Sequence, residues 1–581
     1  MGGCSRYSSK NGADEKVNKH MIPPPKKLYT ANHPFSGQWT KVWFTILFVC
    51  VFFPQGIGLC STYYISSSSG KDSNSGTSSQ TPWKTLNKLE KVTMHPGDSI
   101  LLKRGDIWNE SFIISNSGTK DKPILISAYA EGAMPVLNGA TLLDKWTLNA
   151  DGIYTAKYHG TCNGLLEDGR PIKRALSPGL KDGQWYFDGS FIFYKPAIGK
   201  ASAHQVERCA RGALITIKDT EHVIIDGIVF YGANSFGIRL IDCSYIVIRN
   251  CRVTCNGQDG ISIQRMRAEL NCKSIIIHKN IVEWNANGIY ITGKDDGFKS
   301  DGYSDCEIKN NTVTHTNYQN VWGHSTKDGH ALGIQNSSFC RFEGNTITDN
   351  YSGIALWTAA NYESHNNIFT RNYIARSLLY GIVHGADGAN NSFHNTFSFN
   401  IIIDCGHSAG HWGGLRINRS QSKGNKYYNN TLYNNDINIY LYSLPDYHVI
   451  KNNISMSPQK YHVWVDDSAG THNVIDNNCY YSIRNNFFHF RSPQNLPFAA
   501  WQKKSQQDAS SILTDPFLKS SAPVSENDFR LSENSPCRGR ARNTGFDMGK
   551  DFFGNKCNDI GASGFMTGTK QSSPVTIDHV R

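Results

Sequence analysis

The sequence predicts an all-β protein built as a right-handed parallel β-helix, a solenoid in which short strands coil and stack. Three observations support this: a recurring Asn motif, a recurring Gly-apolar-x-apolar motif, and short alternating strands such as IVIRN and GIYIT between Gly/Asn turns. The repeats are 22 to 35 residues long. Units this small cannot bury their apolar faces singly, so they must stack.

The Asn motif is an apolar residue, two variable residues, Asn, and then Thr, Ile or Cys. Gly227 stands at the same phase upstream, and the Asn residues are Asn250, Asn280, Asn311, Asn345, Asn367, Asn395, Asn430, Asn453 and Asn478. One Asn per coil predicts a ladder in which side-chain amides bond one another and the backbone. The ladder explains the many Asn residues without invoking function.

The Gly motif predicts which side chains face solvent. In a strand whose apolar residues point inward, alternate positions point outward. The second position after each motif Gly, with Asn438 replacing Gly in one coil, gives Arg239, Ser262, Tyr290, Gln335, Ala355, Val383, Arg416 and Tyr440. Aromatic and Arg side chains on one stripe suit a glycan, because rings stack on sugars and Arg grips carboxylates. A solvated strand face would look much the same.

Composition excludes several function classes. The chain of 581 residues has 18% charged residues, 12% aromatic residues and 52 Gly, which argues against a disordered chain or a coiled coil. It contains no phosphate loop, dinucleotide fingerprint, His-Glu-x-x-His or Cys-x-x-Cys motif. The formal net charge of +11 is not clustered as in nucleic-acid-binding proteins. It suits an acidic polymer, or an ordinary basic surface.

The amino-terminal segment predicts export. Residues 42–60 form an apolar run behind a basic flank, and we interpret them as a signal peptide, with an uncleaved membrane anchor as the alternative. Five regions follow: the leader at 1–60, a cap and first coils at 61–140, an inserted β element at 141–212, central coils at 213–490, and a C-terminal coil and cap at 491–581. We expect a monomer.

Two end segments carry a family resemblance. Residues 62–140 contain TYYIS, then GKDSNSGT, PWKT and PGD, and residues 527–565 contain NDFRLSENSPCRGRARNTGFDMGKDFFGNKCNDIGASGF. In these segments the chain resembles secreted right-handed β-helix repeat proteins of the pectate-lyase-like superfold. The resemblance implies the fold. It implies no single reaction, since that group holds lyases, hydrolases, epimerases and unassigned members.

A first long loop, residues 294–305, is rich in carboxylates. Oxygen ligands of this kind hold calcium, so Asp295, Asp296 and Asp301 are candidate metal ligands, and a polar surface loop is the alternative. The run DDGF is similar to the calcium motif of family-nine pectate lyases. Lys299 stands where that motif has its next Asp.

A second long loop, residues 316–332, carries candidate catalytic groups. Lys327, Asp328 and His330 precede the strand GIQN, and His411 stands at the same spacing before its own motif Gly three coils later. Enzymes on regular scaffolds keep their sites in such departures from the repeat. We expect convergence at one edge of the coils, with Lys327, Asp328, His330, His384 and Arg416 as catalytic candidates and Arg239, Tyr290, Gln335, Asp387, His411 and Tyr440 as substrate-binding candidates.

These parts suit cleavage of an acidic, uronate-containing polysaccharide by β-elimination. Arg416 or calcium at Asp295 and Asp296 would neutralise the carboxylate, and His330 or Lys327 would remove the proton. A C5-epimerase would use nearly the same parts.

Two other classes stay open. A glycoside hydrolase would need two carboxylates. The acids available for that role are Asp259, Asp295, Asp296, Asp328 and Asp387. The order NGQDG, DD, GH, RIN is faintly similar to the polygalacturonase series, with Asn418 where that series has Lys. A non-catalytic glycan-binding surface protein is the remaining alternative.

Overall fold

The structure is a computed structural model. It describes residues 60–149, 151–267, 270–293, 302–322, 329–358, 363–385, 391–408, 413–418, 423–443, 445–484, 487–491, 495–543 and 550–564. The chain divides into two compact units, residues 1–57 and 58–581, and the described residues all belong to the second. No helix in the described part is long and apolar enough to cross a membrane. The predicted signal or anchor at 42–60 lies outside it except for Cys60.

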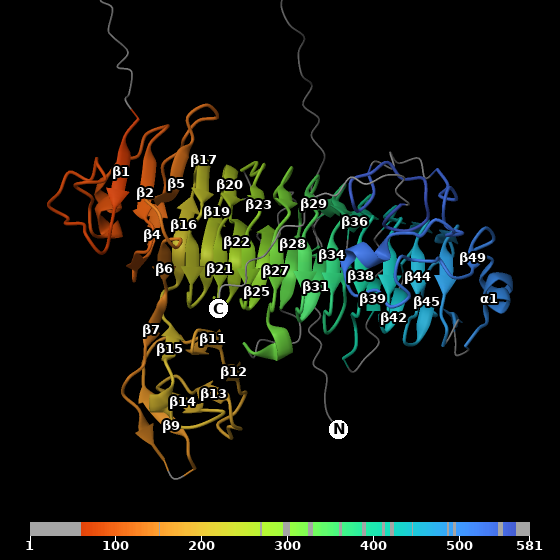
Figure 1. The fold of residues 1–581 in the computed structure, drawn as a ribbon, viewed down its shortest axis with the longest axis horizontal. Helices are drawn as coiled ribbons and strands as arrows, with labels where there is room; N and C mark the ends of the chain where they lie inside the picture. Colours follow the sequence, from red (N-terminus) through yellow and green to blue (C-terminus); the bar gives the residue numbers. More distant parts are fainter. Residues whose placement is uncertain are drawn as a thin grey trace, which may run out of the picture. The chain divides into compact units, whose positions relative to one another are not determined.

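Within the described residues, three long sheets of 13, 12 and 13 strands run side by side, and every pairing in them is parallel. Each turn of the chain contributes one strand to each sheet, so successive strands of a sheet stack on one another from β1 to β49 (Figure 1). This is the predicted parallel β-helix. Crossovers between parallel strands are right-handed almost without exception.

The strands of the first sheet are β1 (Thr62–Ile65), β2 (Ser99–Lys103), β5 (Ile124–Tyr129), β17 (Glu221–Asp226), β20 (Ser244–Arg249), β23 (Ile276–His278), β26 (Glu307–Lys309), β29 (Arg341–Glu343), β33 (Ile368–Thr370), β37 (Thr396–Ser398), β40 (Lys426–Tyr428), β43 (Val449–Lys451) and β46 (Val474–Asp476). The strands of the second sheet are β4 (Phe112–Ile114), β16 (Ala213–Lys218), β19 (Phe236–Ile241), β22 (Asp259–Arg265), β25 (Asn287–Gly293), β28 (His330–Gln335), β31 (Ser352–Trp357), β35 (Ile382–His384), β39 (Gly413–Asn418), β42 (Ile437–Tyr442), β45 (Tyr461–Val465) and β48 (His489–Phe490). The strands of the third sheet are β3 (Ile107–Trp108), β6 (Val136–Asn138), β18 (Val229–Tyr231), β21 (Arg252–Thr254), β24 (Ile281–Glu283), β27 (Thr312–Thr314), β30 (Thr346–Thr348), β34 (Tyr373–Ala375), β38 (Ile401–Ile403), β41 (Thr431–Tyr433), β44 (Ile454–Met456), β47 (Cys479–Tyr481) and β49 (Ile512–Leu513).

The core lies inside the coils, where similar side chains on successive strands stack on one another. Ile238, Ile261, Ile289, Leu332 and Ile354 are in register on neighbouring strands of the second sheet and are fully or almost fully buried. Further along, the rings of Phe342, Phe369, Phe397 and Tyr427 stack at centroid distances of 4.7, 4.6 and 5.0 Å. The motif glycines begin the strands at an inner corner. A Cβ on Gly260 would lie 2.7 Å from the Asn285 side chain, so a larger residue does not fit there.

The Asn ladder exists, but its membership differs from the prediction. In each step one Asn side-chain oxygen accepts the backbone N–H of the Asn before it, at about 3 Å, along Asn280, Asn311, Asn345, Asn372, Asn400, Asn430, Asn453 and Asn478. Asn367 and Asn395 instead begin a second ladder that continues to Asn425. Asn250 is exposed in a left-handed turn, and Cys251 bonds to Asn280 in its place.

The chain leaves the coils once to form an inserted element of two small sheets. One contains β7 (Ala140–Leu142), β10 (Leu165–Glu167), β11 (Arg170–Pro171) and β15 (Val206–Cys209). The other contains β8 (Thr147–Leu148), β9 (Tyr154–Lys157), β12 (Lys173–Arg174), β13 (Gln184–Phe187) and β14 (Phe191–Lys195). Leu166 and Cys209 of this insert pack with Cys255, Ala286 and Trp322 of the coils.

Short elements complete the described fold. They are α1 (Phe498–Ser505), the 3-10 helices η1 (Leu86–Lys91), η2 (Ala201–Ala203), η3 (Tyr318–Asn320) and η4 (Glu526–Phe529), and a two-stranded sheet of β32 (Glu363–His365) and β36 (Asn391–Phe393). At the C-terminal end, the buried Asp508 accepts hydrogen bonds from Trp501 of α1 and from Tyr480 of β47, at 2.8 and 3.0 Å. It thereby ties α1 to the last coils.

Candidate active site

The outward side chains of the second sheet form a single column across ten strands. Register places in it Arg239, Ser262, Tyr290, Gly333, Ala355, Val383, Arg416, Tyr440, Trp464 and His489. The register confirms the predicted stripe except at one coil, but Ser262, Ala355, Val383 and Tyr440 are buried, so these four do not face solvent as predicted. Gly333 occupies the position predicted for Gln335, which lies one column over and accepts a 2.9 Å hydrogen bond from Thr292.

The shift of Gly333 away from the position predicted for the motif Gly has a physical cause. Ile289 pairs with Leu332, so Ala331, not Gly333, takes the inner-corner position of the motif Gly. A Cβ on Gly333 would lie 2.4 Å from the Tyr290 ring, so this glycine makes room for an outward aromatic side chain. The same register places Gly413, rather than His411, in the column of His330, so the phase predicted for His411 is wrong.

A group of polar residues on β22, β25 and β28 surrounds a buried carboxylate. Asp259 is 8% exposed, and its two oxygens accept hydrogen bonds from Ser262 Oγ at 2.6 Å and Asn287 Nδ2 at 3.1 Å. The Asn287 side-chain oxygen in turn accepts the backbone N–H of Gly329 at 2.7 Å and of His330 at 3.2 Å. This network links the Asp259 carboxylate through Asn287 to the backbone of residues 329 and 330, and both Asp259 and His330 are buried. We call Asp259, Ser262, Asn287, Tyr290 and His330 the polar centre.

Two further side chains, Tyr380 and Arg239, interact with the polar centre. The His330 side chain is 3% exposed, and its ring stacks against Tyr380 at 6.3 Å. Arg239 donates from Nε and Nη2 to Gln264 at 2.9 and 2.7 Å. Burial lowers the pKa of Arg239, and the negative charge of Asp259 opposes that shift. The guanidinium therefore stays charged beside the centre, where it suits an anionic group.

Other predicted site residues lie elsewhere. His384 points inward, in register with the core residues Leu356 and Ile417, and bonds to Tyr427 at 2.7 Å and Ser392 at 2.6 Å. Burial holds its pKa well below the usual value. The expectation that it joins the edge cluster is wrong, because the alternation from Val383 turns it into the core. Lys327, Asp328, Asp387, His411, Asp295, Asp296 and Asp301 lie outside the described residues.

Arg416 and Tyr440 lie at the other end of the column, among aromatic residues that the motif search missed. Arg416 lies over the Tyr440 and Tyr442 rings at 5.6 and 4.6 Å. Trp464, Tyr461 and His489 follow on β45 and β48. Part of the signal was present, since VWV places Trp464 outward between the inward Val463 and Val465. It was overlooked because β45 carries no motif Gly.

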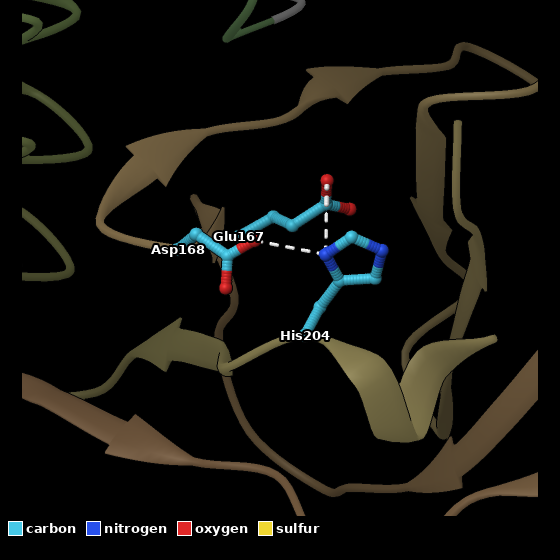
Figure 2. Close-up of side chains that lie close together, drawn as sticks. All are labelled: Glu167, Asp168 and His204. Carbon is cyan, nitrogen blue, oxygen red and sulfur yellow. Dashed lines mark hydrogen bonds and ion pairs between the residues drawn. The ribbon is translucent and has the colours of Figure 1, made fainter. Parts of the chain in front are cut away.

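In the described part of the chain, one cluster has the spacing of a metal site, and it lies in the insert. His204 Nδ1 lies 2.8 Å from Asp168 Oδ2 and 3.8 Å from Glu167 Oε1 (Figure 2). The other ring nitrogen, Nε2, lies 2.8 Å from the Ile198 carbonyl. The hydrogen bond to Asp168 raises the pKa of His204. Because both nitrogens serve as donors, the imidazole is a cation, and the cluster is an ion pair rather than a metal site.

Comparison with known proteins supports the fold. Residues 187–302 match the family model of the right handed beta helix region. Over 86% of its length the chain superposes on 98% of the structure of XylC in complex with xylose, at 13% identity and a TM-score of 0.55. A structure described as a glycoside hydrolase gives 14% identity and a TM-score of 0.52 over 73% of this chain and 97% of that one. The chain is a right-handed parallel β-helix.

One curated relative is similar in sequence over a short stretch. This is the lacto-N-biosidase of Bifidobacterium longum subsp. longum (strain ATCC 15707 / DSM 20219 / JCM 1217 / NCTC 11818 / E194b), 44% identical over 82 residues. The match spans 13% of this chain and 5% of the biosidase. A match over so little of that enzyme does not carry its activity to this chain.

Proposed function

We propose that this protein is a carbohydrate-active enzyme that cleaves a polysaccharide at the polar centre. The observation that carries the proposal is the buried Asp259 carboxylate, which accepts hydrogen bonds from Ser262 and Asn287, while the same Asn287 accepts the backbone N–H of His330. A carboxylate positioned by two donors, beside a histidine, is what acid–base chemistry on a glycosidic bond needs. We further propose that the protein acts outside the cytoplasm, with residues 42–60 as its signal or anchor.

Hydrolysis is the chemistry that this geometry favours. Glycoside hydrolysis uses one carboxyl group as acid and a second as base or nucleophile. Asp259 supplies one of them, and we propose that Asp295, Asp296, Asp328 or Asp387 supplies the other. The 82-residue similarity to a lacto-N-biosidase and the superposition on a glycoside hydrolase agree with this choice.

β-Elimination on a uronate polymer is the second candidate, favoured by the arginines on this face. Arg416 lies on β39, three strands from His330 on β28, or about 14 Å at the usual rung spacing. The two residues would therefore contact different sugars. The carboxylate at the cleaved bond would then be neutralised by Arg239, or by calcium at Asp295 and Asp296. His330 or Lys327 would take the proton.

The test is a digestion of acidic and neutral polysaccharides by the full-length protein, with calcium or with chelator. Reducing ends without ultraviolet absorbance from an unsaturated uronate identify a hydrolase, and both signals together identify a lyase. We expect Asp259→Asn to lower the rate about 10³-fold at unchanged thermal stability. Asp226→Asn, at the end of β17 on another sheet, is the matched control. An Asp259→Asn variant as fast as the unaltered protein would remove the polar centre from consideration.

A further inference from the structure

The outward face of the late coils carries a cluster of aromatic side chains, which we call the aromatic platform: Tyr440, Tyr442, Tyr461, Trp464 and His489. Trp464 lies at the middle of the cluster. Its ring centroid is 5.0 Å from that of Tyr440, 5.3 Å from that of Tyr461 and 4.5 Å from that of His489. Tyr442 packs on Tyr440 at 5.3 Å and is 38% exposed.

These rings do not fill the core. The inward residues of the same strands, Leu441, Val463 and Val465, already occupy it. Other strands of the same sheet have Ser262 on β22 and Ala355 on β31 at the same column position, so the fold does not require a large ring there. Tyr442 is exposed, Tyr461, Trp464 and His489 are half-buried, and Tyr440 is buried. Large rings that reach the surface in one cluster mark a binding surface.

The cluster carries one positive charge. Arg416 lies over the rings of Tyr442 and Tyr440, and its Nε donates to Asn418 at 3.0 Å. Rings with polar tips, Tyr, Trp and His, rather than aliphatic side chains, suit a ligand with an apolar ring face and many hydroxyl groups. A guanidinium at its border suits a carboxylate. A sugar acid has an apolar ring face, many hydroxyl groups and a carboxylate.

The platform is separate from the polar centre. Between them, the buried Ala355, Val383, Leu379 and Tyr380 form an apolar cluster of their own. From Tyr290 on β25 to Tyr440 on β42 there are five rungs, or about 24 Å. A single sugar cannot reach both, and only a chain of several sugars can.

We propose that the aromatic platform is a second glycan-binding site, which holds a uronate unit of the polymer away from the point of cleavage. Its sugar ring stacks on Trp464 and Tyr442, and its carboxylate pairs with Arg416. The inference rests on the proposed function, because the polymer held there is the one that the polar centre cleaves. The late coils would then keep a long polysaccharide chain bound between cleavage events.

The test measures binding alone, in full-length Asp259→Asn protein, by affinity electrophoresis and tryptophan fluorescence. The probes are polygalacturonate, its methyl ester and xylan. We expect Trp464→Ala and the more exposed Tyr442→Ala to weaken binding of polygalacturonate about tenfold or more. Arg416→Gln should weaken binding of polygalacturonate but not of its ester. The matched control is Tyr447→Ala, which removes an exposed ring stacked on His472 elsewhere.

The outcomes separate the two proposals. Binding that depends on Trp464, together with no cleavage of any polysaccharide by the unaltered protein, would overturn the proposed function and support the platform. Equal binding by Trp464→Ala, Tyr442→Ala and the control would overturn the platform, as would failure to bind any of the three polymers. Tighter binding of xylan than of polygalacturonate would overturn the choice of an acidic sugar.

Discussion

The early coils around β22 and β25 and the late coils around β42 and β45 distribute polar residues in opposite ways. In the early coils the inside is aliphatic, with Ile261, Ile263 and Ile291 fully buried, and the polar centre lies on the same strands and on β28. In the late coils the inside holds His448 and His462, both fully buried, and the outward face is aromatic. Both sets keep the same coil and the same Asn ladder.

The difference teaches what this fold fixes and what it leaves open. The coil requires only that each column stack compatible side chains, rung upon rung. The motif Gly column shows this, since Gly260 and Gly414 give way to Asn438 and His462 at the same position. The outward column varies more, from Gly333 and Ala355 to Trp464. Function can therefore differ along one face while the backbone hardly changes.

A fall in pH should produce the largest difference in stability between the early and the late coils. Burial lowers the pKa of His448 to about 3 and that of His384 well below its usual value. An unfolded histidine has a pKa near 6.5, so the unfolded chain binds more protons below that pH. Stability is full above pH 6.5 and falls as the pH drops toward 3. At pH 5 the unfavourable charging of His448 costs about 2 kcal/mol.

The protonation of Asp508, at the C-terminal end of the coils, has the opposite effect on stability. Burial raises the pKa of Asp508 to about 6, so its protonation below pH 6 returns about 1 kcal/mol by pH 5. The net loss still falls on the late coils. Hydrogen exchange of the full-length protein at pH 7 and pH 5 should show residues 425–465 losing protection before residues 221–265.

The control for the acid effect is His448→Phe. Neither ring nitrogen of His448 has a hydrogen-bond partner among the described residues, so phenylalanine removes a buried unpaired group along with the titration. We expect this variant to be more stable at pH 7 and to lose less stability at pH 5. Equal acid loss in the early coils would show that the contrast between the two interiors has no energetic consequence.

The Asn ladder is what the two sets of coils share, and breaking it should cost the same in each. Asn280→Ala would leave the Cys251 N–H and the Ile248 carbonyl without their partner, and Asn430→Ala would do the same to Asn400 and Phe397. Two orphaned backbone groups predict a loss of about 3 kcal/mol at either site.

Urea unfolding of each ladder variant checks this. The control is Asn250→Gly, which keeps the left-handed turn and removes only an exposed bond to Asp226, so its stability should change little. A loss at Asn280 very different from that at Asn430 would mean that the ladder does not support the coils uniformly.

The fold could be predicted well from the sequence because every repeat must meet the same requirement, that its side chains stack on those of the next coil. It predicted ladder membership less well, since Asn367 and Asn395 fit the same motif at a different corner. The signal was in the spacing: the predicted steps around them are 22 and 35 residues, whereas the steps through Asn372 and Asn400 are 27, 28 and 30.

The site was harder to predict than the fold. Spacing from Gly333 misplaced Gln335 and His411, because Ala331 fills the inner corner in that coil. Asp259 was one acid among five candidates, and no motif marks Ser262 and Asn287 as its donors. Their side chains meet through register between two strands, β22 and β25, which a search along the chain does not reveal. The platform was missed for a different reason, because β45 carries no motif Gly.

The smallest expected effect concerns Tyr290, the aromatic residue that interrupts the polar half of the column. Gly333→Ala places a methyl group against its ring and should turn the ring out of its place, at a cost of about 1 kcal/mol. If that ring stacks on the sugar at the cleavage point, KM for the polymer rises a few-fold while kcat and thermal stability hardly change. Gly212→Ala, where a Cβ meets nothing within 4 Å, is the matched control. An unchanged KM would mean that Tyr290 does not contact the sugar, so that aromatic recognition belongs to the late coils alone.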